Sequence, residues 1–201
     1  MKPPKRMFKG REPLASIRTR HNDPNNIRFI ATHEAGHAVL AVVLDLPLES
    51  VDIKQRRLPD GRVSVGYTAL GTSITLRDLR GMSEEDLIPM VIQIMAGNIA
   101  ESVVHPECRN YGAHQMDLED ARQRVAIALC KPVDRGDGKL EITGEEMQRN
   151  MPRLRGVFDR AHDATTQLVK DNWPAIERVA ALLMERKQLS GAEVAAVVNG
   201  A

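Results

Sequence analysis

The chain has 201 residues, of which 42% are hydrophobic and 27% are charged, and its formal net charge is +1. This length fits one domain, or one domain with a tail, and the composition is that of a globular protein. A net charge near zero excludes a strong overall field that would steer the molecule to nucleic acid. Aromatic residues make up only 3%, so aliphatic residues must build the core, which favours helices packed on helices.

Residues 1–25 differ from the rest of the chain. They contain seven Lys or Arg residues, two acidic residues and four prolines, and few apolar residues. We interpret this stretch as a flexible basic N-terminal arm that precedes a domain over residues 26–201. A solvated tail is the simpler interpretation of the arm, and an arm that binds nucleic acid or a partner protein is the alternative.

Cysteine usage and hydropathy predict where the chain works. The two cysteines, Cys108 and Cys130, are too few for a disulfide framework. No apolar segment follows the basic N-terminal residues, so we expect no secretory signal. No window reaches 18 consecutive apolar residues, so we expect no transmembrane helix and no membrane partner. A cytoplasmic, reduced protein is the resulting expectation.

Periodicity and capping residues predict a mainly helical fold with one small sheet, an α+β arrangement. Six helices are expected, over residues 27–46, 83–104, 116–130, 143–171, 172–185 and 190–198. Alternating apolar residues predict two strands, over residues 50–54 and 63–67, and loops are expected over 107–115 and 132–138. The capping boxes that begin at Thr143 and Ser190 support two of these helices, and Pro89 and Pro152 are positions where a helix could kink.

The segment His33-Glu34-Ala35-Gly36-His37 lies in the middle of the first predicted helix. Residues four apart share one helix face, so the two imidazoles could coordinate one zinc ion from the same side. Glu34 points along the flank of that face, where its carboxylate could accept a proton from a water on the metal. This arrangement is typical of a zinc metallopeptidase with an HExxH motif.

A solvated helix face that carries two histidines and a glutamate is the alternative to a metal site. The apolar residues on both sides of the motif argue against it, because they place these polar groups in the interior, where they need partners. Gly36 costs the helix about 1 kcal/mol relative to Ala and therefore indicates close backbone packing. A zinc site also needs a third ligand, and spacing does not choose among the available side chains. These candidates are Glu101, His105, Asp117, Glu119, Asp120 and His162.

Several segments in order along the chain resemble the peptidase domain of the FtsH family, the membrane-anchored ATP-dependent zinc proteases. Residues 32–39 are similar to that family's zinc helix, and Val65-Gly66-Tyr67-Thr68 resembles its Leu-Gly-Tyr-Thr strand. Residues 95–101 resemble its Gly-Gly-Arg-x-Ala-Glu helix, and residues 117–121 its Asn-Asp-Leu-x-x-Ala segment. The C-terminal Leu189-Ser190-Gly191-Ala192-Glu193 resembles its last helix start. The resemblance covers residues 26–198.

The resemblance implies roles for individual residues and one zinc ion per chain. His33, His37 and Asp117 would be the zinc ligands and Glu34 the catalytic base. The segment Gly66, Tyr67, Thr68 and Ala69 would bind substrate, which could add to it as a strand. Glu101 would accept a hydrogen bond from a zinc-bound imidazole, and a structural ion pair is the other interpretation of this residue.

The chain also departs from the family pattern. It contains no Gly-x-x-x-x-Gly-Lys-Ser/Thr loop, so we expect an endopeptidase that acts on peptides or unfolded segments without ATP. The stretch before Asp117 is one residue longer than in the family, which keeps Asp120 as an alternative ligand. Asn98 replaces the family's Arg.

Two further hypotheses concern activity and partners. The chain could be a catalytically inactive, zinc-stabilised binding or regulatory module of the same fold, although the intact Glu34 favours an enzyme. An ATPase acting in trans could deliver a peptide or protein substrate. The family assembles into hexameric rings to which its ATPase contributes, so a homo-oligomer is expected without a subunit number. Nucleic acid is not an expected substrate, given the net charge.

Overall fold

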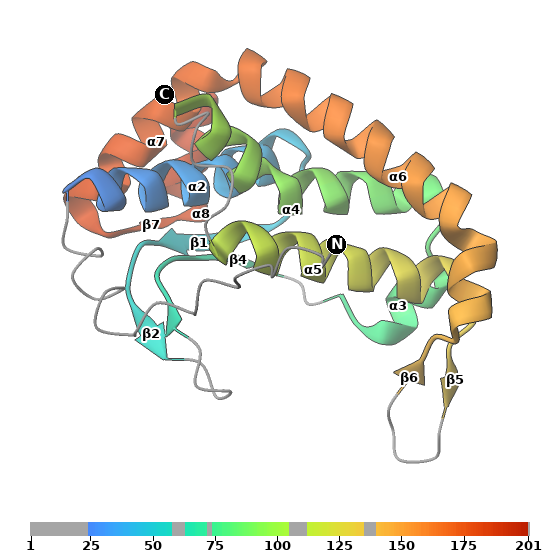
Figure 1. Ribbon diagram of the computed structural model, residues 1–201. Helices are drawn as coiled ribbons and strands as arrows, with labels where there is room; N and C mark the ends of the chain where they lie inside the picture. Colours follow the sequence, from blue (N-terminus) through green and yellow to red (C-terminus); the bar gives the residue numbers. More distant parts are fainter. Residues whose placement is uncertain (1–23, 58–62, 72–73, 105–111, 135–139, 201) are drawn as a thin grey trace, which may run out of the picture.

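The computed structural model describes residues 24–57, 63–71, 74–104, 112–134 and 140–200. Its helices are α2 (Pro24–Val43), α3 (Leu76–Gly81), α4 (Glu84–Val104), α5 (Gly112–Leu129), α6 (Gly144–Asp171), α7 (Trp173–Arg186) and α8 (Gly191–Val198). Its strands are β1 (Leu48–Asp52), β2 (Arg56–Arg57), β3 (Val63–Ser64), β4 (Tyr67–Leu70), β5 (Val133–Asp134), β6 (Leu140–Glu141) and β7 (Gln188–Ser190). The mainly helical fold with a small sheet is therefore confirmed (Figure 1).

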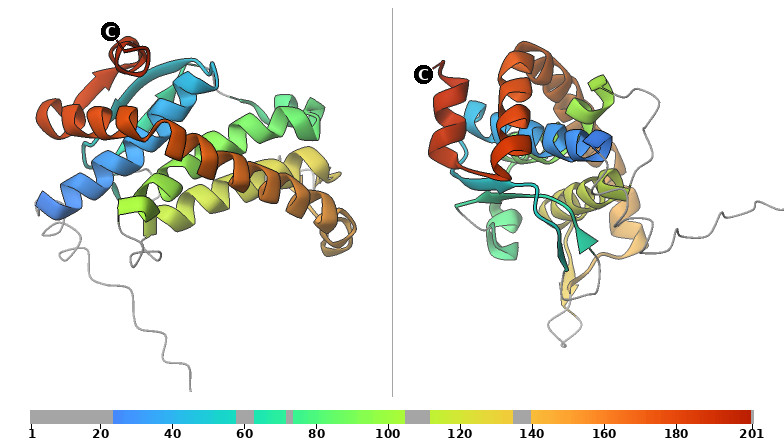
Figure 2. Two further views of the ribbon diagram at one scale, coloured as in Figure 1. Left: turned by 90° about the horizontal axis from the view of Figure 1, so that it is seen from above. Right: turned by 90° about the vertical axis from the view of Figure 1, so that its left-hand side faces the viewer.

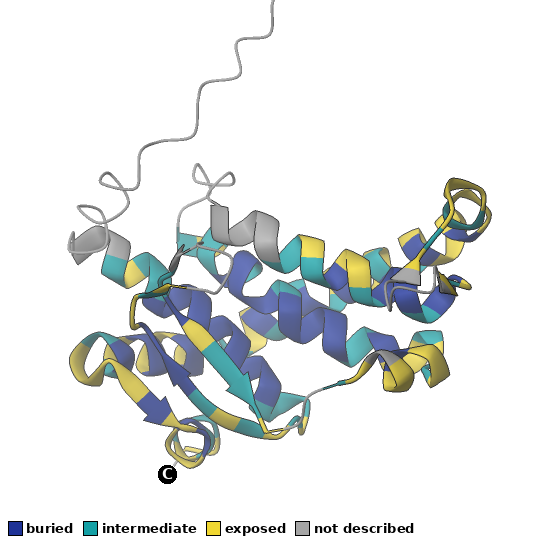
Figure 3. Ribbon diagram, turned by 90° about the horizontal axis from the view of Figure 1, so that it is seen from below, coloured by how far each residue is buried: buried dark blue, intermediate teal, exposed yellow. Residues whose placement is uncertain are grey.

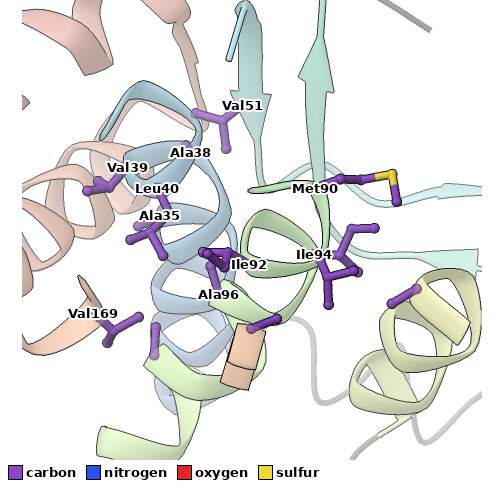
Figure 4. Close-up of a cluster of buried hydrophobic side chains, with 14 of the residues drawn as sticks. Ala35, Ala38, Val39, Leu40, Val51, Met90, Ile92, Ile94, Ala96 and Val169 are labelled. Carbon is purple, nitrogen blue, oxygen red and sulfur yellow. The ribbon is translucent and has the colours of Figure 1, made fainter. Parts of the chain in front are cut away.

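Helices α2 and α4 form the centre of the molecule. Residues 31–41 of α2 are all buried, and α4 packs against α2, α5 and α6 (Figures 1 and 2). Small residues at the contact let the two backbones approach, as Figure 4 shows for Ala35 of α2 and Ala96 of α4. A Cβ atom on Gly36 would lie 2.7 Å from the Ala96 carbonyl oxygen. The close packing that this glycine predicted is present.

A three-stranded antiparallel sheet lies against α2, with strand order β4-β1-β7. Val51 of β1 pairs in register with Thr68 of β4 and Leu189 of β7. Successive residues on a strand face opposite sides of the sheet, and the side that carries the fully buried Val51 and Leu189 faces α2. Tyr67, which precedes Thr68, lies on the opposite side and is exposed. Figure 3 shows buried, intermediate and exposed residues along the strands, and mostly buried residues in the central helices behind them. Strand β4 thus forms one edge of the sheet.

The predicted helix starts agree with the capping hydrogen bonds. The side chains of Ser83, Thr143 and Ser190 each accept a hydrogen bond from the backbone three residues later. The helices continue through Pro89 and Pro152. The expected cap at Asn172 does not form, because its side-chain amide donates to the Leu168 carbonyl of the preceding helix instead.

Some expected boundaries were wrong. The single strand expected over residues 63–67 is divided between β3 and β4, and the loop expected over 107–115 is helical from Gly112 onward. The loop expected over 132–138 contributes β5 to a two-stranded hairpin with β6 (Figure 1). The strands β2, β6 and β7 and the helix α3 were missed. Helix α3 begins with a capping box between Thr75 and Asp78, which is a readable signal, whereas three-residue β7 is too short for alternation to show.

Among the described residues, α4 is long and apolar enough to cross a membrane by length and composition. No such helix was expected from the sequence. The core helix of a globular domain has the same composition, and 56% of the most apolar stretch of α4 is buried inside the molecule. Its neighbours α2, α5 and α6 account for that burial, so the length of α4 is weak evidence for a membrane span.

Candidate metal centre and active site

Three side chains from two helices converge on one point. His33 and His37 lie one turn apart on α2, and their Nε2 atoms are 3.0 Å from each other. Asp117 of α5 brings its Oδ2 atom to 3.1 Å from His33 Nε2 and 3.3 Å from His37 Nε2. Both histidines are buried and Asp117 is partly buried. The structure thus brings together the three residues that the family resemblance implied as ligands.

The outer nitrogen of each imidazole has an oxygen acceptor. His37 Nδ1 lies 2.7 Å from the backbone carbonyl oxygen of Gln93, which can only accept a hydrogen bond. His33 Nδ1 lies 3.3 Å from Oε2 of Glu101. Both acceptors are on α4 and favour the tautomer with hydrogen on Nδ1. The Nε2 lone pairs then point inward, toward each other and toward the Asp117 carboxylate.

This arrangement fits a bound cation. Two imidazole lone pairs and a carboxylate oxygen within 3.3 Å repel one another unless a positive charge lies between them. Among the described residues, Oδ2 of Asp117 is a buried oxygen without a hydrogen-bond partner. Nitrogen and oxygen ligands bind zinc at about 2.0–2.2 Å, so two ligand atoms on a tetrahedral ion lie roughly 3.3 Å apart. The observed separations are close to that value.

The cluster of His33, His37 and Asp117 also binds protons strongly. Burial of the ring lowers the pKa of His33, but the carboxylates of Asp117 and Glu101 outweigh burial and raise it to about 10. Burial of the Asp117 carboxyl opposes its charge, yet the imidazoles of His33 and His37 outweigh burial and lower its pKa. A proton and a metal cation therefore compete for the same ligand atoms.

A glycine leaves room for the two rings. Gly97 of α4 lies directly beneath them, and a Cβ atom there would overlap His37 Nε2 and lie 2.8 Å from His33 Nε2. A side chain at this position would require both imidazole rings to move. The sequence pattern predicts no specific role for Gly97, although a glycine inside a long apolar helix is a signal of close approach.

Glu34 lies outside the cluster of ligand atoms. Its side chain is buried, and the Thr68 hydroxyl lies 2.8 Å from its Oε2 atom. Burial raises the pKa of Glu34, while the charges of His33 and His37 and the Thr68 hydroxyl oppose that increase. A carboxylate beside a metal-binding cluster, but not part of it, is where a general base would lie.

Among the described residues, the other candidates for a third ligand do not join the cluster formed by His33, His37 and Asp117. Asp120 faces away and forms an ion pair with Arg124, with 2.8 Å between Oδ2 and Nε. Glu119 is exposed, and His162 is exposed beside Asp163. His105 lies outside the described residues. Glu101 does lie at the site, but it contacts the Nδ1 atom of His33 and not the inward-facing nitrogen.

The segment expected to bind substrate lies next to Glu34. Gly66 and β4 run along the sheet edge, and the Thr68 side chain reaches Glu34. On the outer face, the Arg56 guanidinium stacks over the Tyr67 ring at 5.1 Å from its centroid. A hydrogen-bonded ion pair with buried Asp52 holds Arg56 in place. Although Arg56 covers part of its ring, the Tyr67 residue is 54% exposed at the start of the edge strand.

No protein-family model matches the chain. It is similar to proteins named ATP-dependent zinc metalloprotease FtsH. That of Kosmotoga olearia is 25% identical over 90% of this chain and 30% of the relative. FtsH 1 of Thermoanaerobacter sp. (strain X514) is 28% identical over 91% of this chain and 32% of the relative. FtsH 1 of Symbiobacterium thermophilum is 29% identical over 84% of this chain and 28% of the relative.

The chain is FtsH-like in sequence. The matched relatives cover nearly all of this chain, and the helical fold holds the histidines and the aspartate in one cluster. The FtsH-like domain spans about 30% of the length of these relatives.

Proposed function

We propose that the FtsH-like domain is a zinc-dependent endopeptidase that cleaves peptide bonds in peptides or unfolded segments and needs no ATP for the cleavage itself. The observation that supports this most directly is the convergence of two imidazole nitrogens and a carboxylate oxygen beside a buried glutamate outside the cluster. The matched relatives carry the name zinc metalloprotease, which agrees with this chemistry.

His33, His37 and Asp117 would hold one zinc ion per chain. The ion, when bound, would lower the pKa of a water molecule to about 7 and polarise the substrate carbonyl. Gln93 and Glu101 would keep both imidazoles in the tautomer that donates outward and binds inward. These contacts come from α4, so the packing of α4 on α2 sets the direction of both rings.

Glu34 would act as the general base and then as the acid. Its carboxylate takes one proton as water oxygen forms a bond to the peptide carbonyl carbon. The bond from that carbon to nitrogen then breaks, and Glu34 gives its proton to the leaving amine. Burial favours this role because it raises the pKa of Glu34. A carboxyl group with a raised pKa can both accept a proton and return it.

The edge of the sheet would hold the substrate. An extended peptide can add to β4 as a further antiparallel or parallel strand, which binds its backbone with little dependence on sequence. Such binding requires an extended chain, so a folded substrate would have to be unfolded first. We also propose that an ATPase acts in trans to deliver the substrate. The formation of a homo-oligomer and a cytoplasmic location are further proposals.

Replacement of Glu34 by Gln tests the proposal. The amide keeps the size of the side chain but cannot accept the proton, so we expect the Glu34→Gln variant to lose peptidase activity by at least about 100-fold. Zinc content, measured by atomic emission on purified protein, should stay at one ion per chain. The matched control is Glu119→Gln on the exposed face of α5, which should keep full activity.

Two outcomes would contradict the proposal. Full activity of Glu34→Gln would exclude the assigned base. A wild-type domain that binds zinc but cleaves no unfolded protein would instead favour the alternative, a zinc-stabilised binding module without catalysis.

A further inference from the structure

The Glu34 carboxylate is held by the sheet and not by its own helix. The hydroxyl of Thr68, on β4, donates to Oε2 of Glu34 at 2.8 Å, and the same hydroxyl lies 3.4 Å from the Glu34 backbone carbonyl oxygen. The residues are 34 positions apart in the sequence. This contact therefore exists only when β4 is packed on α2.

A second contact limits the carboxylate from its other side. A Cβ atom placed on Gly66 would lie 2.6 Å from Cγ and 2.8 Å from Cδ of Glu34, and it would overlap Oε1. The glutamate side chain thus lies directly against the Gly66 backbone. Oε1 faces Gly66 while Oε2 receives the Thr68 hydroxyl, so two residues of one segment define where the carboxylate lies.

Orientation matters for this side chain because glutamate is flexible. Its last torsion angle is broad, so nothing in the side chain itself fixes the plane of the carboxylate. A carboxylate has several acceptor positions, and one hydrogen bond at Oε2 leaves Oε1 able to accept a proton. A buried charged group without a hydrogen bond would also be unfavourable, so the Thr68 hydroxyl stabilises the buried carboxylate as well as orienting it.

We propose that Thr68 is a positioning residue that orients the Glu34 carboxylate for proton transfer. This inference rests on the proposed function. Thr68 belongs to the same strand edge on which the substrate would lie. Substrate position and base orientation are therefore set by one short segment, Gly66 to Thr68, and not by two independent parts of the protein.

The test compares Thr68→Val, Thr68→Ser and a control variant, each made in the full chain and loaded with zinc. Thr68→Val keeps the branched shape and removes the hydroxyl, and Thr68→Ser keeps the hydroxyl and removes the methyl group. We expect Thr68→Val to lower kcat about tenfold, the cost of one hydrogen bond to a charged group, while KM and zinc content stay unchanged. Thr68→Ser should recover at least half of the wild-type kcat.

The matched control is Thr165→Val. Thr165 is fully buried in α6, and its hydroxyl donates to the Ala161 carbonyl oxygen at 2.6 Å. This variant also loses a buried hydroxyl, so it should lose stability without losing kcat. Equal kcat for Thr68→Val and wild type would overturn the proposal, as would a loss in Thr68→Ser as large as that in Thr68→Val. Thr68→Ala takes the place of Thr68→Val if that variant does not fold.

A structural measurement separates this proposal from the proposed function. Crystal structures of zinc-loaded wild type and Thr68→Val should show the carboxylate of Glu34 in one orientation in the first and rotated or in several orientations in the second. An unchanged carboxylate would overturn the role of Thr68 whether or not the wild type cleaves peptides. If the carboxylate is rotated in Thr68→Val but fixed in a wild type that lacks peptidase activity, the positioning role is supported and only the endopeptidase proposal is rejected.

Discussion

The ligand cluster depends on a residue that contributes no atom to it. Gly97 leaves the space that the two imidazole rings occupy, and its backbone belongs to the helix that orients both rings through Gln93 and Glu101. Spacing predicted His33 and His37, whereas Asp117 came from the family resemblance and the Gln93 carbonyl could not be predicted. A backbone carbonyl has no side-chain signature, and its direction is known only once α4 is placed beside α2.

Gly97→Ala should therefore remove metal binding. The added methyl group would collide with both Nε2 atoms, so we expect zinc affinity to fall by at least about 100-fold, measured by competition with a chelating dye. Gly156→Ala in α6 is the control, because a Cβ there meets nothing within 4 Å. It should keep zinc and raise the free energy of unfolding by about 0.5–1 kcal/mol, since Ala favours a helix over Gly. Unchanged zinc affinity in Gly97→Ala would show that the rings can move away.

At the scale of elements, long helices were predictable and short strands were not. Helix α6 was predicted from its capping residue Thr143 to Asp171, because a 28-residue periodic stretch leaves little ambiguity. Strand β4 was predicted too early along the chain, and β7 was missed, because both are defined by their pairing with β1. Pairing joins segments far apart in sequence, and four residues or fewer carry too little alternation to reveal it.

The edge strand allows a prediction about substrate binding. Tyr67 is 54% exposed at the start of β4, beside the position where a peptide would add. We expect Tyr67→Ala to raise KM for an unfolded protein substrate about three- to tenfold with little change in melting temperature, because an exposed aromatic contact contributes roughly 0.5–1.5 kcal/mol. Val133→Ala on β5, a residue exposed to the same degree, should leave KM unchanged. A similar KM for both variants would place the substrate elsewhere.

At the scale of the whole molecule, the metal would join parts of the chain that are distant in sequence. Its proposed ligands lie on α2 and α5, and the groups that would orient the two imidazoles lie on α4. A ligand that binds only the folded state adds to the free energy of unfolding, by about 4.1 kcal/mol at 1,000 times its dissociation constant. The central helices are therefore the part of the fold that metal removal should loosen.

Chelation should accordingly lower the melting temperature of the wild-type domain by several degrees, as measured by circular dichroism with and without EDTA. The Asp120→Ala variant should respond to the chelator as the wild type does, since Asp120 pairs with Arg124 away from the site. The Asp117→Ala variant should melt at the same temperature with and without EDTA. A chelator effect that survives in Asp117→Ala would exclude Asp117 as a ligand.

The division of the site between α2 and α5 also has a consequence during synthesis of the protein. A ribosome releases the chain from its N-terminus, so His33, Glu34 and His37 emerge well before Asp117. A half-made chain would hold the base and two ligands, but not the third ligand. On the proposed mechanism, peptide hydrolysis would then require α5 to have packed against the core.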